Sequence, residues 1–199
     1  LKDPRSKVSC HYFIGRNGDV YRMINDNKVA WHAGQSRWQD IKNLNNHSIG
    51  IEIQNKGHRI KYQNFTKKQI SSLIKLLKTF MRKYKIKMKN ILGHSDIAPS
   101  RKKDPGEKFP WKKLGKEGVS FRHNLNVKKT KIYRGKKLSS NEKKVFIKNL
   151  YQFGYCQIKE KNNNQSMRYL TKAFQRRFRQ DLVNGKIDKE CFLISKSLN

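Results

Sequence analysis

The stretch from Thr66 to Tyr84 constrains the fold more than any other part of the sequence. Upstream of it, apolar residues tend to alternate with polar ones; from Thr66 onward they recur every three to four positions, opposite a face of lysines, at Ile70, Leu73, Ile74, Leu77, Phe80, Met81 and Tyr84. The second spacing places apolar side chains on one face of an α-helix. Thr66 followed by Gln69 is a capping-box pattern, so we predict a helix over residues 67–84.

Strand-like segments precede this helix. Residues 8–14 and 20–24 are rich in β-forming side chains and flank a glycine-containing turn at residues 16–19, so they predict a hairpin. Residues 49–53 form an apolar run interrupted by one glycine and by Glu52. That run predicts a central, buried strand that carries a carboxylate.

The segment after the helix combines a histidine with prolines. Residues 90–94 predict a short strand that ends at His94. Residues 95–110 hold three of the four prolines and show no helix or strand pattern. Such a stretch is typical of a long, ordered, functional loop.

Beyond a polar stretch at residues 115–130, the pattern becomes helical. Residues 141–153 and 166–182 predict two amphipathic helices, and a short helix ends the chain. The sequence therefore predicts an α/β fold with a mixed central sheet flanked by helices, followed by a small three-helix domain. We place the first domain at residues 1–120 and the second at residues 121–199.

The charge is strongly positive, with 47 Lys and Arg against 14 Asp and Glu and a net charge of +33. This balance favours an acidic partner such as a nucleic acid, an anionic membrane face or an acidic polymer. A+T-rich codons offer a second explanation, because they enrich Lys, Asn and Ile without selection for a ligand. Aromatic residues make up 11% of the chain and favour a folded core over a disordered tail. No apolar run is long enough for a transmembrane segment.

Three ionisable residues are poorly explained by packing alone. Glu52 lies in an apolar strand, His94 at a strand end, and Asp104 in the proline-rich loop. Taken singly, Glu52 is equally consistent with a strand carboxylate paired with a lysine, and a lone histidine such as His94 is more often a satisfied core or rim residue than a ligand. Taken together, an imidazole and a carboxylate ten residues apart fit a metal site.

Five ordered motifs resemble the zinc-dependent N-acetylmuramoyl-L-alanine amidases over roughly residues 4–114. This family has the type 2 amidase fold, which it shares with peptidoglycan-recognition proteins and phage amidases. The motifs are VSCHYFI at residues 8–14, AWHAG at 30–34, SIGIE at 48–52, GHSDIAP at 93–99, and KKDPG at 102–106 with FPW at 109–111.

The second domain resembles the three-helix peptidoglycan-binding domain that is often fused to these amidases. The likeness rests on LYQFGY at residues 150–155, AFQ at 173–175 and NGKID at 184–188. An ordinary helical bundle would explain the same apolar positions, so the likeness supports the domain more than any binding residue in it.

The resemblance implies a zinc cofactor. It assigns His94 and Asp104 to two of the three protein ligands. The first ligand in the family is a histidine about twenty residues before the motif that begins at Val8, so we expect it upstream of Leu1. The amino-terminal part of the catalytic domain is then expected to precede this chain as well.

The resemblance also implies roles for the neighbouring residues. Glu52 matches the carboxylate that takes a proton from the attacking water, and Lys102 matches the cation that stabilises the oxyanion. Trp31, His32 and Gly34 match a motif that we interpret as lining the substrate cleft; for His32, structural support is the alternative.

These roles imply a peptidoglycan hydrolase that cuts the amide between N-acetylmuramic acid and the L-alanine of the stem peptide. Its partners would be peptidoglycan or muropeptides rather than a specific nucleic acid, because stem peptides carry free carboxylates that suit a basic surface. The expected setting is the bacterial cell envelope, periplasmic or associated with the outer membrane, or secretion; no export signal is visible. The alternatives are a non-catalytic peptidoglycan-recognition module and a basic nucleic-acid-binding protein.

Overall fold

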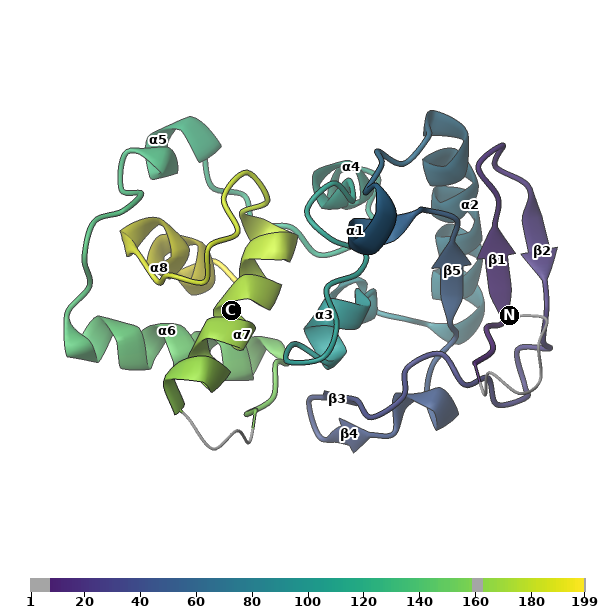
Figure 1. Ribbon diagram of the computed structural model, residues 1–199, viewed down its shortest axis with the longest axis horizontal. Helices are drawn as coiled ribbons and strands as arrows, with labels where there is room; N and C mark the ends of the chain where they lie inside the picture. Colours follow the sequence, from purple (N-terminus) through teal and green to yellow (C-terminus); the bar gives the residue numbers. More distant parts are fainter. Residues whose placement is uncertain (1–7, 159–162, 199) are drawn as a thin grey trace.

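The computed structural model describes residues 8–158 and 163–198, which form two lobes side by side (Figure 1). The first lobe contains a three-stranded sheet of β1 (Tyr12–Ile14), β2 (Val20–Arg22) and β5 (Ile51–Ile53). β1 pairs antiparallel with β2 and parallel with β5. The sheet is therefore mixed, and the predicted hairpin is confirmed.

The strand that carries Glu52 differs from the prediction in its place in the sheet. The order of strands is β2-β1-β5, so β1 is central, and β5 is an edge strand among the described residues. All three residues of β5 are half-buried rather than fully buried. An edge position leaves one side of the strand open, which explains the partial exposure of its side chains.

Helix α2 (Lys67–Tyr84) has the bounds that its hydrophobic spacing predicts. Thr66 and Gln69 form the predicted capping box, in which the Thr66 hydroxyl accepts from the Gln69 N–H at 3.0 Å. The helix packs against the sheet through its apolar stripe (Figure 1). The buried cluster that results comprises Ile14, Ile70, Leu73, Ile74, Leu77, Phe109, Trp111, Leu114 and Val119.

The predicted strand at residues 90–94 is wrong. The segment contains a 3-10 turn, η3 (Met88–Asn90), and His94 begins a short helix, α3 (His94–Ile97). The Asp96 carboxylate accepts a hydrogen bond from the Gly93 N–H at 2.8 Å and so caps the helix that starts there. A cap satisfies a backbone donor that a helix start leaves free, which favours helix over strand.

Several short elements lie between these parts. The first lobe also contains the two-residue pair β3 (Arg37–Trp38) and β4 (Ile41–Lys42), the 3-10 turn η2 (Leu44–Asn46) and helix α1 (Gly57–Ile60). Helix α4 (Trp111–Lys116) ends the loop that the prolines mark. The hydrophobic spacing predicts none of β3, β4, α1 and α4, because each is too short to show a period.

The second lobe is helical. It contains α5 (Val127–Lys131), α6 (Ser140–Phe153), α7 (Asn163–Phe178) and α8 (Lys189–Lys196). The three predicted helices correspond to α6, α7 and α8, and α5 is additional. α7 ends four residues before the predicted end. None of the helices in the described ranges is long and apolar enough to cross a bilayer.

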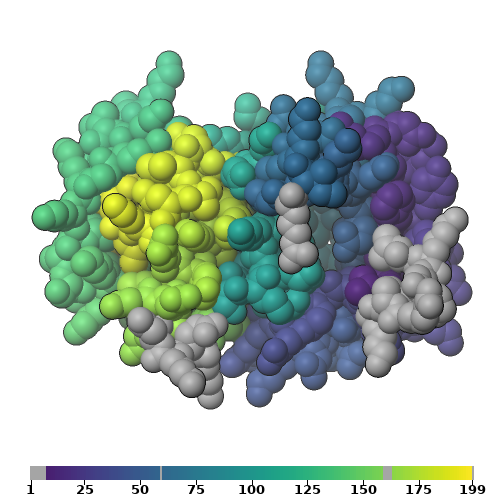
Figure 2. All heavy atoms as spheres, viewed as in Figure 1, coloured from purple at the N-terminus to yellow at the C-terminus, as the bar shows by residue number. Residues whose placement is uncertain are grey.

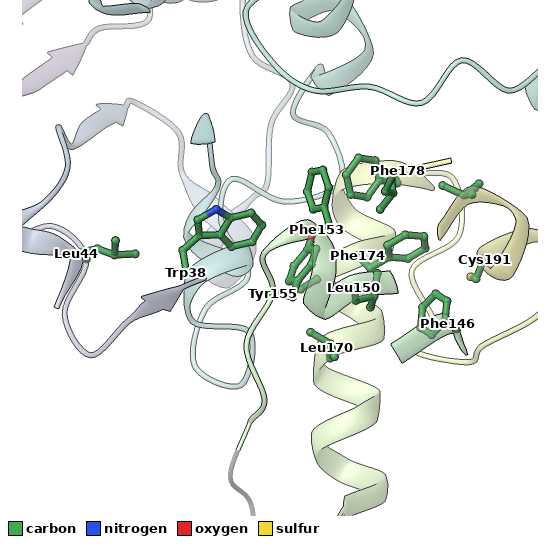
Figure 3. Close-up of a cluster of buried hydrophobic side chains, with 14 residues drawn as sticks. Trp38, Leu44, Phe146, Leu150, Phe153, Tyr155, Leu170, Phe174, Phe178 and Cys191 are labelled. Atoms are coloured by element: carbon green, nitrogen blue, oxygen red, sulfur yellow. The ribbon is translucent and has the colours of Figure 1, made fainter. Parts of the chain in front are cut away.

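Residues of both lobes share one apolar cluster (Figure 3). Trp38 of the first lobe packs edge-on against Phe153 and Tyr155, with ring centroids 5.8 and 5.2 Å away. Ala33 and Leu44 belong to the same cluster as the buried faces of α6, α7 and α8. Burial of these side chains stabilises the two lobes against each other; the division near residue 120 stays a prediction.

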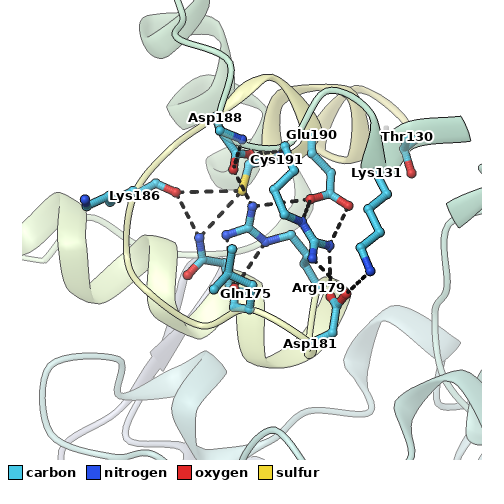
Figure 4. Close-up of polar contacts among 12 residues, drawn as sticks. Thr130, Lys131, Gln175, Arg179, Asp181, Lys186, Asp188, Glu190 and Cys191 are labelled. Carbon is cyan, nitrogen blue, oxygen red and sulfur yellow. Dashed lines mark hydrogen bonds and ion pairs between the residues drawn. The ribbon is translucent and has the colours of Figure 1, made fainter. Parts of the chain in front are cut away.

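A polar network connects the segments that follow α5 and α7 with the start of α8 (Figure 4). The guanidinium of Arg179 donates to Asp188 at 2.6 Å, and Arg134 donates to Glu190 at 2.6 and 2.9 Å. Asp188 also caps α8 by accepting from the Cys191 N–H at 3.0 Å. These buried charges are paired, which is the condition under which burial of a charge is tolerated.

Candidate active site

The structure brings His94 and Asp104 together. His94 is the first residue of α3, and Asp104 lies in the loop that follows this helix. His94 Nδ1 and Asp104 Oδ2 are 2.9 Å apart, with 14% and 59% of their side chains exposed. The predicted pair therefore meets at the surface of the first lobe, facing solvent on the carboxylate side.

The contact of the second ring nitrogen of His94 determines which nitrogen carries the proton. Nε2 lies 3.1 Å from the backbone oxygen of Ala33, which can only accept, so Nε2 carries a proton. In the neutral ring Nδ1 is then an acceptor that faces a second acceptor on Asp104. Two acceptors at this distance need a proton or a cation between them, and a metal-ligating histidine commonly donates its other N–H to a backbone carbonyl.

The donor set therefore fits a metal, although two ligands are fewer than zinc ordinarily takes from a protein. Within residues 8–158 and 163–198, no group of three His, Cys, Asp or Glu side chains could hold a metal ion.

Glu52 lies within electrostatic range of this pair. Burial raises the pKa of its carboxyl above the ordinary value, and the negative charge of Asp104 acts in the same direction, while His94 and Lys102 lower it. Beside Glu52 lies the thiol of Cys10, whose pKa burial and the Glu52 charge raise to about 11. A carboxylate with a raised pKa in a partly apolar setting is suited to accept and return a proton.

Lys102 lies on the same loop as Asp104 and is half-buried. Its N–H donates to the Ala98 carbonyl at 2.9 Å, which ties the loop to α3. The positive charge of Lys102 acts on both Glu52 and Asp104. The pKa of Asp104 is lowered, because the hydrogen bond and charge of His94, with Lys102, outweigh the opposing effect of desolvation.

The loop of Trp31, His32 and Gly34 lies beside the pair. Ala33 O accepts from His94 and also from the Arg101 guanidinium at 2.8 Å. Gly34 has φ +57°, and a Cβ there would lie 3.2 Å from Arg101. Trp31 is 54% exposed. The Ala33 carbonyl thus ties the loop to His94 and Arg101, and contact of the loop with substrate stays a prediction.

His32 is half-buried and packs closely against Gly50 and the ring of His11. Burial, followed by the neighbouring His11, lowers the pKa of its imidazole to about 4. The ring packs on Gly50, where any Cβ would lie closer than 3.0 Å to atoms of His32. Its Nε2 is buried without a hydrogen-bond partner. His32 is therefore neutral at pH 7 and cannot act as a cation toward substrate.

Residues that the sequence did not single out also shape the site. The Arg101 guanidinium donates to the Ala33 carbonyl, and the Asp96 carboxylate caps the start of α3 by accepting from the Gly93 N–H. Asp96 in turn accepts from Arg177 and Tyr155 of the second lobe, at 2.7 Å each. The signal for Asp96 was present, since it stands at the third position of a helix start, but its long-range partners are set by tertiary packing alone.

Fold and site together define a class of protein. The mixed sheet and the helix that covers it form the type 2 amidase fold. On this fold, the His94–Asp104 pair lies at the surface, within electrostatic range of the half-buried Glu52. A family model described as N-acetylmuramoyl-L-alanine amidase matches residues 1–107. The chain belongs to the N-acetylmuramoyl-L-alanine amidase family.

Individual relatives support this assignment. The chain is 33% identical over 206 residues to N-acetylmuramoyl-L-alanine amidase AmiD of Escherichia coli, covering 96% of this chain and 74% of AmiD. It is 42% identical over 108 residues to 1,6-anhydro-N-acetylmuramyl-L-alanine amidase AmpD of Haemophilus influenzae, covering 54% of this chain and 56% of AmpD. The chain therefore spans about half the length of that AmpD.

Solved structures show the same fold. An AmiD structure from Escherichia coli superposes with a TM-score of 0.82 at 32% identity, covering 96% of this chain and 79% of AmiD. AmpDH3 from Pseudomonas aeruginosa gives a TM-score of 0.82 at 30% identity, covering 96% of this chain and 82% of AmpDH3. Because each of these two superpositions covers 96% of this chain, each includes both lobes.

Proposed function

We propose that this chain hydrolyses the amide bond between N-acetylmuramic acid and the L-alanine of a peptidoglycan stem peptide. The observation that carries the proposal is the pair of His94 and Asp104, 2.9 Å apart, within electrostatic range of Glu52 and Lys102. Family membership supplies the bond that is cut, and the chain's own residues supply a site suited to amide hydrolysis.

Zinc is the proposed cofactor. When bound, zinc would polarise the scissile carbonyl and lower the pKa of water to about 7. His94 Nδ1 and the Asp104 carboxylate would hold it, and the Ala33 carbonyl would keep the imidazole in the required tautomer. A third protein ligand, a histidine in the family pattern, is proposed to complete the set.

Glu52 is proposed as the general base and acid. Its raised pKa favours acceptance of a proton from the attacking water and its return to the leaving amine of L-alanine. Lys102 is proposed to stabilise the negative oxygen of the tetrahedral intermediate. Removal of one such donor typically costs ~10²–10³ in rate.

Muropeptides are the proposed substrates. The AmiD structure is a complex with anhydro-N-acetylmuramic acid-L-Ala-D-gamma-Glu-L-Lys, and a second AmpDH3 structure holds an anhydromuramic pentapeptide. These ligands support a muramyl peptide as the substrate class of this chain. Trp31, His32 and Gly34 are proposed to line the cleft that receives it. We place the enzyme in the bacterial cell envelope, periplasmic or outer-membrane-associated, or in the secreted fraction.

The proton-transfer role is tested by Glu52→Gln, which keeps shape and removes the base. The variant is expected to keep its melting temperature and to lose about 10²–10⁴ in kcat, because that is the usual contribution of a general base. Glu117→Gln, which changes an exposed glutamate paired only with Lys78, is the matched control. Cleavage of a muramyl tripeptide at the wild-type rate by Glu52→Gln would contradict the assignment.

The metal role is tested by zinc affinity rather than by rate alone. His94→Ala and Asp104→Ala are expected to weaken zinc binding at least tenfold in a competition assay with a chromogenic chelator. His47→Ala, on an exposed histidine outside the site, should leave the affinity unchanged. Equal affinities in all four proteins would show that these residues are not ligands.

A further inference from the structure

Helix α7 presents a row of cations toward the catalytic loop. Arg168, Lys172 and Arg176 are spaced four residues apart, so they lie on one face of the helix. Burial lowers the pKa of Lys172, and the positive charges of Arg168, Arg176 and Lys103 lower it further. Lys103 belongs to the loop between the proposed catalytic residues Lys102 and Asp104, so four cations from two lobes converge here. We call these four residues the seam cluster.

No residue of the seam cluster forms a direct ion pair with a carboxylate of the described residues, and the charges of Glu107, Asp104 and Asp96 act on Arg176 only through space. Arg176 is 8% exposed, its Nε is buried without a hydrogen-bond partner, and it forms no ion pair within residues 8–158 and 163–198. The three carboxylates whose charges act on Arg176 have other hydrogen-bond partners, and Asp96 is paired with Arg177. Glu107 contacts His58 Nε2 at 3.1 Å, and Asp104 contacts His94.

A buried guanidinium nitrogen without a hydrogen-bond partner is costly, and like charges four residues apart on a helix repel one another. The neighbouring Arg177 and Arg179 show the usual solution, since each is paired with a buried carboxylate at 2.7 and 2.6 Å. Arg176 differs from both in having no such carboxylate partner among the described residues. The fold therefore keeps a cation at this place at a cost that a bound anion would offset.

We propose that the seam cluster is a subsite for a free carboxylate on the peptide part of the substrate. This inference rests on the proposed function and adds to it which part of the muropeptide is read and by which lobe. Figure 2 shows the segment after His94 flanked on one side by the first lobe and on the other by the atoms of α7. The second lobe would then take part directly in substrate selection.

A carboxylate suits the cluster better than other groups. The planar guanidinium of Arg176 matches the two oxygens of a carboxylate, and Lys103 and Lys172 can add single donors from either side. Stem peptides carry such carboxylates, whereas the neutral sugar ring offers none. Because Lys103 lies between Lys102 and Asp104, a peptide bound at the cluster stays next to the bond that is cut.

A second basic surface provides a contrast. A cavity of about 460 Å³ beside α4 is lined by Lys108, Lys112, Lys113 and Lys116. All four lysines are exposed, whereas Arg176 is buried. That cavity has no unpartnered buried cation, so it serves here as a control.

The test measures binding of a free stem tripeptide that contains D-glutamate, by calorimetry on the whole chain. This peptide has no bond to muramic acid, so its binding does not depend on catalysis. The wild type is expected to bind the tripeptide about tenfold more tightly than the same peptide with its carboxylates amidated, a ratio typical of charge-assisted hydrogen bonds. Arg176→Met and Lys103→Met should abolish that ratio, and Lys112→Met should retain it.

Lys103 is exposed, so its variant keeps the test valid if loss of the buried Arg176 unfolds the chain. Equal binding of acid and amide peptides by the wild type would overturn the proposal, as would equal binding of inorganic phosphate and the acid peptide. Failure of the proposed function would appear differently, as tripeptide binding with the expected ratio but no cleavage of the muramyl peptide.

Discussion

Asp96 and Arg177 form an ion pair between the two lobes, with Oδ2 and the guanidinium nitrogen 2.7 Å apart and about 1% of each side chain exposed. Asp96 also accepts from the Tyr155 hydroxyl, and Arg177 donates to the Ile91 carbonyl at 2.8 Å. The guanidinium carbon lies 4.3 Å from the ring centroid of Trp111. The second lobe therefore holds the segment that presents His94, two residues before Asp96.

Loss of Arg177 should loosen that segment. Arg177→Met leaves the Asp96 carboxylate buried and unpaired, which typically costs about 3–5 kcal/mol of unfolding free energy. Hydrogen exchange of residues 91–98 should accelerate, measured by mass spectrometry below the melting temperature. Zinc affinity should fall several-fold with it, because His94 loses its fixed place.

Arg179→Met is the matched control for this experiment. Arg179 is equally buried and pairs with Asp188, but its partners lie within the second lobe (Figure 4). It should destabilise the protein to a similar degree while leaving exchange at residues 91–98 unchanged. Identical exchange profiles in the two variants would remove the positioning role from Arg177.

Gly50 should tolerate no side chain. A Cβ there would overlap the ring of His32. The Gly50 N–H also donates a hydrogen bond to His11 Nδ1 at 3.0 Å. Gly50→Ala is expected to cost about 1–3 kcal/mol, the usual cost of overpacking. The Cβ of Gly15→Ala would lie 2.8 Å from the Asn17 side-chain oxygen and in ordinary contact, at 3.8 Å, with the Tyr21 ring, so this substitution should cost less. Urea denaturation compares the two, and equal midpoints would refute the tight packing.

His32 should make stability depend on pH. Its pKa is about 4 in the folded protein and ~6.5 when unfolded, so the unfolded chain binds more protons between these values. Unfolding free energy should therefore be fully present above pH 6.5 and fall by ~2 kcal/mol as pH drops toward 4, allowing for partial solvent access. His32→Gln should flatten this slope, whereas the exposed-site control His47→Gln should keep it.

The parts of the fold that the sequence predicts are those with a local signal. The helix at residues 67–84 has both a period and a capping box, and the hairpin has a turn with Gly18 at φ +94°. The strand predicted at residues 90–94 failed because a short apolar run does not distinguish a strand from the start of a capped helix. The edge position of β5 could not be predicted, since strand order depends on contacts distant in sequence.

The site residues also divide into those that a local motif predicts and those that only tertiary packing determines. Its motifs pointed to Glu52, His94, Lys102 and Asp104, and the structure places these residues in electrostatic or hydrogen-bond contact. No local pattern marks which arginine of α7 pairs with Asp96 and which stays unpaired. That choice depends on the rotation of α7 against the first lobe, which only tertiary packing sets.

The bond that is cut tests the central claim most directly. The measurement is cleavage of anhydro-muramyl-L-Ala-D-Glu-L-Lys in water enriched in oxygen-18, followed by mass spectrometry of both products. Water attack at the lactyl carbonyl predicts one heavy oxygen in the carboxylate of the muramyl product and an unlabelled peptide with a free L-alanine amine. Oxygen-18 in the peptide product, or a muramyl product that keeps its L-alanine, would contradict the account.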